Sequence, residues 1–143
     1  MKKLARILVP VDGSAGSGRA VELAAELAEA IGAVLDILYV SYFDRGTDAQ
    51  EESWLPDSIA GPVGDKAQET LAWAQQHILL AVPVTCHRCT GIPADEILRF
   101  AEDQSVDLIV VGGRGLGVVE GFLLGSVSQA VVERAVTSVV VAK

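Results

Sequence analysis

Short apolar runs alternate with longer amphipathic segments along this chain. The runs are rich in valine, isoleucine and leucine, which is typical of strands buried on both faces of a parallel sheet. They predict strands over residues 6–11, 33–40, 107–111 and 138–142, and a further strand is expected over residues 82–89. Such strands need a covering layer on each side.

The segments between these runs carry a helical period. In residues 20–31, apolar positions recur three and four apart, glutamates fill the other face, and Gly32 ends the pattern. Further helices are predicted over residues 65–80 and 127–135 and from Pro93 onward. Because strands and helices alternate throughout, we predict an α/β fold with an open parallel five-stranded sheet and helices on both faces.

One long connection departs from this alternation. Residues 42–64 are acidic and contain two prolines. Most of this range is predicted to be an irregular excursion from the fold. It is interpreted either as a solvated loop or as a lid over a ligand.

Size and charge restrict the class of protein. The chain has 143 residues, half of them hydrophobic, and a formal net charge of −8, so a single domain over residues 1–143 is expected. The acidic balance argues against nucleic-acid partners and anionic membranes. No apolar run approaches the roughly 20 residues of a membrane-spanning helix, so no membrane insertion is expected. The run after the basic N-terminus is broken by Arg6, Pro10 and Asp12, which indicates a first strand and makes the cytoplasm the default location.

Cys86 and Cys89 form a C-x-x-C pair, which can signal a redox site or half of a zinc site. Both lie in a predicted strand, where residues three apart point to opposite faces. A zinc site also needs two further ligands, and no second cysteine pair exists. Ordinary structural cysteines are therefore expected.

Two unusual loops follow predicted strands, at residues 10–14 and 111–117. In open parallel sheets, ligands bind beyond the carboxyl ends of the strands, where the winding reverses. The second loop lacks the Walker lysine, and Val118 stands where the dinucleotide fingerprint needs glycine. Its glycines would still let backbone approach a ligand, and the helix opening at residues 125–128 suits a phosphate. Alternatively, the glycines make turns and Ser126 forms a capping box with Gln129.

The order of these motifs resembles the universal stress protein family along essentially the whole length. Its ATP-binding members carry G-x-x-G, nine residues, and then G-[S/T]. The chain has Gly112 to Gly115, nine residues, and then Gly125-Ser126. Three further segments look like the family's first strand, its second strand and the entry to its third helix: Ile7 to Ser14, Leu38 to Val40 and Gly91 to Ala94.

The resemblance implies a Rossmann-like sheet of order 3-2-1-4-5, ATP as bound ligand together with Mg²⁺, and a homodimer joined through the last strand. It implies that Asp12 contacts ribose or adenine, that backbone near Val40 holds the base, and that the glycine-rich segment holds the phosphates. A turn or helix-start contact is the alternative role for Asp12. The candidate nucleotide-binding residues are Pro10, Val11, Asp12, Val40, Gly112, Gly113, Arg114, Gly115, Gly125, Ser126, Val127 and Ser128.

Two positions depart from the family pattern. The nine-residue spacer carries Glu120 and no basic residue, which leaves Arg114 as the nearby cation and predicts modest or metal-dependent phosphate affinity. The last strand is usually preceded by proline, and the chain has Ser138 instead.

The expected function is an ATP-binding stress or regulatory protein that signals through an unknown protein partner. An enzyme would need a positioned base and charge-neutralising cations. His77 and His87 fall outside the candidate loops, so no catalytic or metal-ligating residue is assigned. A weak ATP hydrolase and a nucleotide-free interaction module of the same fold are the alternatives, and fold alone does not separate them.

Overall fold

A computed structural model describes residues 3–42, 57–113 and 125–143. Strands and helices alternate along these parts of the chain, as the sequence pattern predicts. Their bounds are β1 Arg6–Val11, α1 Ala15–Ile31, β2 Val34–Tyr42, α3 Asp57–Gln76, β3 Val84–Gly91, α4 Pro93–Asp103, β4 Leu108–Gly112, α5 Ser126–Arg134 and β5 Ser138–Ala142.

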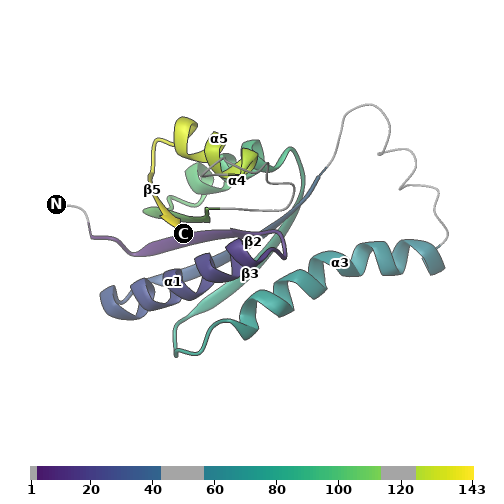
Figure 1. The fold of residues 1–143 in the computed structure, drawn as a ribbon, viewed down its shortest axis with the longest axis horizontal. Helices are drawn as coiled ribbons and strands as arrows, with labels where there is room; N and C mark the ends of the chain where they lie inside the picture. Colours follow the sequence, from purple (N-terminus) through teal and green to yellow (C-terminus); the bar gives the residue numbers. More distant parts are fainter. Residues whose placement is uncertain (1–2, 43–56, 114–124) are drawn as a thin grey trace.

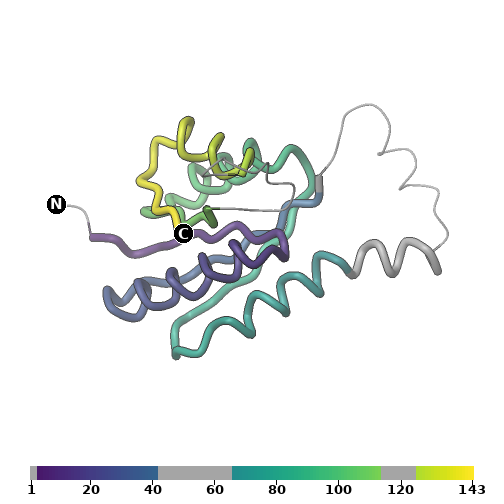
Figure 2. The backbone as a smooth tube through the Cα atoms, in the orientation of Figure 1, coloured from purple at the N-terminus to yellow at the C-terminus, as the bar shows by residue number. Residues whose placement is uncertain are grey.

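The five strands form one parallel sheet in the order β3-β2-β1-β4-β5. Helices α1 and α3 cover one face of this sheet, and α4 and α5 cover the other (Figure 1). The first strand, purple in the backbone trace, lies inside the sheet rather than at its edge (Figure 2). The predicted fold class and strand order are therefore confirmed, and the winding reverses between β1 and β4.

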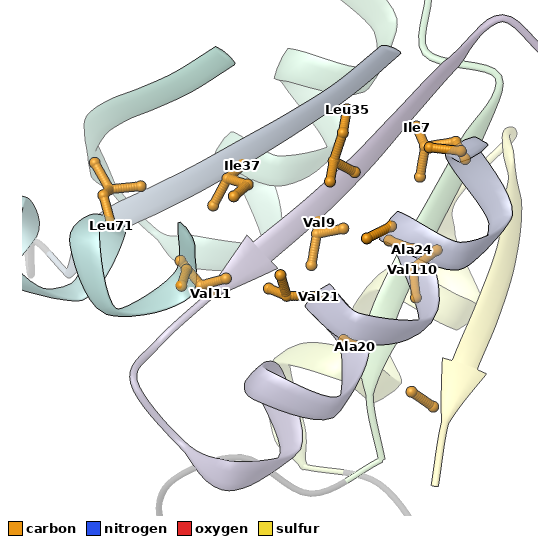
Figure 3. Close-up of a cluster of buried hydrophobic side chains, with 14 of the residues drawn as sticks. Ile7, Val9, Val11, Ala20, Val21, Ala24, Leu35, Ile37, Leu71 and Val110 are labelled. Carbon is orange, nitrogen blue, oxygen red and sulfur yellow. The ribbon is translucent and has the colours of Figure 1, made fainter. Parts of the chain in front are cut away.

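The position of β1 in the middle of the sheet explains why its sequence is apolar at nearly every residue. Ile7 and Val9 face a core shared with α1 and α3, whereas Leu8 faces a second core beneath α4 and α5. In the first core, side chains of β1, β2 and β4 meet α1 and Leu71 of α3 (Figure 3). Each face of the sheet thus removes its own set of apolar side chains from water.

Helices α1 and α3 begin earlier than predicted, and α3 ends at Gln76 rather than at residue 80. Helix α1 begins at Ala15, ahead of the periodic stretch, because the Ser14 hydroxyl accepts the Ser17 N–H at 3.2 Å and caps it. Helix α3 begins at Asp57, so the prediction of irregular structure over residues 57–64 is wrong. Gly61, Pro62 and Gly64 all lower intrinsic helix propensity, which made this part resemble a loop.

A buried carboxylate ties three strands together. The Asp36 side chain on β2 is 3% exposed and accepts hydrogen bonds from Arg6 of β1 and, at 2.8 Å, from His87 of β3. Burial alone would raise the pKa of the Asp36 carboxyl, but the hydrogen bonds from Arg6 and His87 hold that pKa below its ordinary value. The charge is therefore paired within the sheet.

Helix α4 ends in a left-handed turn that glycine usually makes. Ser105 has φ 54°, with its N–H bonded to Glu102 O and the Val106 N–H bonded to Ala101 O, which is the Schellman pattern. We expect Ser105→Gly to raise the free energy of unfolding by about 0.5–1 kcal/mol, because glycine adopts this conformation without a Cβ penalty. Ser105→Ala keeps the Cβ and is the control. Urea denaturation in which both variants have the same stability would contradict this explanation.

Candidate functional site

A pocket lies at the carboxyl ends of β1 and β4, where the winding reverses. The β1–β4 ladder pairs Leu8 with Ile109 and does not reach Pro10, whereas the β1–β2 ladder continues to Val11. Proline has no N–H to donate to a ladder. Strands β1 and β4 thus separate beside Pro10, and the starts of α1, α4 and α5 surround the opening between these two strands. Its lining residues are Pro10, Val11, Asp12, Ser14, Ser17, Leu38, Val40, Pro93, Ile97, Val111, Gly112, Gly125, Ser126, Val127 and Ser128.

The first wall of the pocket is the loop between β1 and α1. The Ser14 N–H donates to Asp12 Oδ1 at 2.9 Å, and Gly13 makes the turn at φ 85°. The buried Ser17 hydroxyl donates to the Ser14 carbonyl at 2.9 Å. These bonds fix the loop before any ligand arrives. Asp12 therefore makes the local turn contact that was its alternative role, and it also lines the pocket.

The second wall is the start of α5. Gly125 is the N-cap residue and has no side chain with which to cap the helix. The first N–H groups of a helix lack intrahelical acceptors, so those of residues 126–128 are available to an anion at the positive end of the helix dipole. All three residues line the pocket.

The predicted capping box at this helix is wrong. Ser126 is the first helical residue rather than the cap, and the Gln129 side chain bonds to Glu133 at 3.1 Å instead of turning back. Gly125 already has the extended cap conformation, with φ −67° and ψ 162°, which moves the helix start back by one residue. The Ser126 hydroxyl consequently has no capping role.

Backbone hydrogen bonds connect this wall to β4 and β5. The Gly125 N–H donates to Gly113 O at 3.2 Å, and the Gly113 N–H donates to Ala142 O at 2.7 Å. The Ser128 hydroxyl donates to Gly112 O at 2.8 Å. The two ends of the glycine-rich segment are therefore joined, and the start of α5 is held against the sheet.

The floor of the pocket is apolar. Leu38 and Val40 lie two apart on β2 and reach it from the same face, while Pro93 and Ile97 reach it from α4. Sequence reasoning did not include Leu38, Ile97 or Ser17 in the site. The period-2 pattern of β2 could have identified Leu38, but Ile97 required knowledge of where α4 packs.

The structure brings most of the predicted site residues together. Those that line the pocket are Pro10, Val11, Asp12, Val40, Gly112, Gly125, Ser126, Val127 and Ser128. Gly113 is buried behind the wall and acts through its backbone bonds. Arg114 and Gly115 lie outside the described residues.

Gly112 has a packing role that the sequence did not reveal. A Cβ at this position would lie 2.6 Å from the backbone C and O of Gly16. Helix α1 thus rests directly on the end of β4, and a side chain at position 112 has no room beside the α1 backbone. The close approach brings the α1 loop beside the α5 start and so gives the pocket its two walls.

The two cysteines take no part in this site. Cys86 packs against the core under α1 and α3, and Cys89 packs against the core under α4 and α5, so the predicted placement on opposite faces is confirmed. Burial raises the pKa of both thiols, which disfavours the reactive thiolate. Over the described ranges, no cluster of three or more His, Cys, Asp or Glu side chains could hold a metal ion.

Fold and pocket together define a Rossmann-like α/β protein with a ligand crevice at the switch point of its sheet. In the part of the chain that the structure describes, no helix has the length and hydropathy to cross a bilayer. The chain belongs to the universal stress protein family, whose sequence pattern it matches over residues 3–143.

Individual relatives agree with this assignment. A universal stress protein of Methanocaldococcus jannaschii, MJ0531, is 32% identical over 140 residues, which cover 96% of this chain and 81% of the relative. A solved universal stress protein in complex with cAMP is 28% identical, with a TM-score of 0.69 and coverage of 98% and 97%. The Archaeoglobus fulgidus protein in complex with dAMP is 25% identical, with a TM-score of 0.70 and coverage of 99% and 100%.

Proposed function

We propose that this chain binds an adenine nucleotide in the pocket between β1 and β4 and acts as a cytoplasmic regulatory protein of the stress response. The observation that carries the proposal is the start of α5, which has a glycine N-cap and faces the Asp12 loop across an apolar floor. Such an arrangement offers backbone donors to phosphate and apolar surface to a base. The complexes of two family members with cAMP and dAMP support an adenine nucleotide as the ligand.

Each wall of the pocket has a role in this proposal. Asp12 would contact the ribose or adenine, backbone at Val40 would hold the base, and the α5 start would hold phosphate. ATP accompanied by Mg²⁺ is the ligand that the glycine motif indicates, with Gly112 to Gly115 completing the phosphate site. We assign no catalytic residue and propose that the bound nucleotide controls contact with a protein partner, rather than serving as the substrate of a hydrolase.

Mass spectrometry of nucleotide released from freshly purified protein tests this function. The proposal predicts adenine nucleotide in up to one equivalent per chain. The control is Gly125→Val, purified in parallel, which should release much less. Protein that carries no nucleotide and gains no thermal stability from millimolar adenine nucleotides would favour the nucleotide-free interaction module.

We further propose a homodimer joined through β5. This strand is an edge of the sheet, Val139 to Val141 are half-buried, and Val136 just before it is fully exposed. An unpaired apolar edge is an association hazard that pairing with a second copy would remove. Sedimentation velocity at micromolar concentration should show a dimer, and a monomer under these conditions would contradict the proposal.

A further inference from the structure

A second hollow lies at the amino end of the sheet, on the face that α4 and α5 cover. It opens between the carboxyl ends of these two helices and the starts of β4 and β5, and we call it the amino-end hollow. Residues 43–56 and 114–124 join the fold after β2 and β4, at the other end of the sheet. The hollow has a volume of about 360 Å³, and its described apolar lining residues are Leu98, Ala101, Val106, Ile109, Ala135 and Val136.

The apolar surface of the amino-end hollow continues from a buried floor to an exposed rim. Ile109 on the floor is fully buried, whereas Val136 on the rim is fully exposed. An apolar cavity of about 150 Å³ accommodates benzene, so this hollow has room for at least one large apolar side chain. A small ligand would fill the floor and leave Val136 in water. The surface therefore fits a chain segment, which can cover Val136 while it inserts an apolar anchor.

The rim of the amino-end hollow carries negative charge. Glu102 lines it, Asp103 ends α4 beside it, and both are exposed. The last turn of α4 has no basic residue, and the carboxyl ends of α4 and α5 each add about half a negative charge. Arg134 also lines the hollow, but its guanidinium pairs with Asp95 at 2.8 Å. Because acidic side chains oppose the dipole at a helix carboxyl end, Glu102 and Asp103 do not stabilise α4, and a cation is their complement.

Neighbouring charges do not reverse this sign. Lys2 and Lys3 precede β1 in the chain, and the start of β1 lies beside Asp107, whose carboxylate accepts backbone N–H groups there. The carboxylates of Glu102, Asp103 and Asp107, together with the two helix ends, outweigh both lysines. The whole chain has a formal net charge of −8, so its general field also attracts a cationic partner.

We propose that the amino-end hollow is the docking surface for a basic amphipathic segment of a protein partner. The segment inserts an apolar anchor, and its lysine or arginine side chains face Glu102 and Asp103. Charge complementarity favours this occupant over a second copy, because a chain of net charge −8 is repelled by an acidic rim. The proposed dimer would use the free edge of β5, and the pocket between β1 and β4 lies at the opposite end of the sheet. The docking surface therefore does not depend on nucleotide binding.

Fluorescence anisotropy with three synthetic peptides of about 14 residues, roughly 21 Å as helices, tests the proposal on the full chain. The first peptide carries leucine and lysine at helical spacing, the second has glutamate in place of lysine, and the third has serine in place of leucine. The first should bind once per chain, at least about tenfold more tightly than either of the others. Added KCl should weaken its binding, because screening reduces the attraction. Equal affinities for the lysine and glutamate peptides would overturn the proposal.

Paired variants locate the binding surface. Val136→Ser removes the exposed apolar contact and Glu102→Gln removes the rim carboxylate, so each should weaken binding of the lysine peptide by about threefold or more. Leu79→Ser and Glu26→Gln are the matched controls, because Leu79 is 90% exposed before β3 and Glu26 is exposed on α1. Neither control should change the affinity. If a control weakens binding as much as its partner variant, the peptide binds without using the hollow, and the proposal is wrong.

Sedimentation velocity of the Val136→Ser protein tests the competing occupant. This variant should have the same oligomeric state as the natural protein, and a dimer that becomes a monomer would show that a second copy covers Val136. Nucleotide binding is measured on the same samples. Protein that binds nucleotide but none of the peptides would refute the docking surface alone. Protein that binds the lysine peptide with the expected variant effects, but no nucleotide, would support the docking surface and refute the proposed function.

Discussion

Gly112→Ala should lower the free energy of unfolding by about 3 kcal/mol, the upper end of the range for overpacking. The new Cβ would lie 2.6 Å from backbone atoms of Gly16 and 3.0 Å from the Ser17 nitrogen. A flexible side chain could rotate away from such a contact, but these atoms belong to the first turn of α1. Either the helix moves off the sheet or β4 distorts, and in both cases the walls of the pocket separate.

Gly32→Ala is the matched control for this substitution. Gly32 caps α1 at φ 71°, and a Cβ there would meet nothing within 4 Å. The control should therefore cost only about 1–2 kcal/mol from its left-handed backbone and leave nucleotide affinity unchanged. Urea denaturation measures both variants. If the Gly112→Ala protein is as stable as the natural protein, α1 does not pack directly against β4 as described.

Gly125→Val should abolish nucleotide binding while the protein remains folded. The substitution places a branched side chain at the helix start that forms one wall of the pocket. Because Gly125 has φ −67°, valine adopts its backbone conformation without left-handed strain. The stability cost should stay near the N-cap difference, a few tenths to about 1 kcal/mol. Calorimetry should detect no binding, and circular dichroism and melting should be close to those of the natural protein.

Ser126→Ala is the gentler companion to Gly125→Val. Since Ser126 is not the cap residue, alanine removes a hydroxyl without removing a cap. If that hydroxyl contacts phosphate, affinity for nucleotide should fall while affinity for adenosine stays constant. Equal losses for both ligands would contradict a phosphate contact. If the Gly125→Val protein binds nucleotide with unchanged affinity, the ligand does not bind at the start of α5.

The strands and the layer arrangement could be predicted because burial on both faces forces a continuous apolar run. Arg6–Val11 and Ser138–Ala142 have the predicted bounds. The start of α3 could not be predicted, since Gly61, Pro62 and Gly64 each disfavour helix locally. The capping box at Ser126 failed for a related reason: glycine can also serve as an N-cap, and spacing alone does not show which residue does.

The site was only partly visible in the sequence. Polar and glycine residues at strand ends, such as Asp12 and Gly125, carry motifs that can be recognised. Apolar lining residues such as Ile97 look like any other core position, and only the packing of α4 brings it to the pocket. Gly112 was predicted as a phosphate contact, and its steric role against Gly16 depends on a helix-to-sheet distance that no sequence pattern reports.

We propose that one adenine nucleotide binds per chain at the start of α5. Calorimetric titration of the purified, nucleotide-stripped protein with AMP, cAMP and Mg²⁺-ATP tests it most directly, with the Gly125→Val protein as the matched control. We predict binding at one site per chain for at least one of these ligands, competition between those that bind, and no binding by the control. No heat and no thermal shift with any of them at millimolar concentration would contradict the claim.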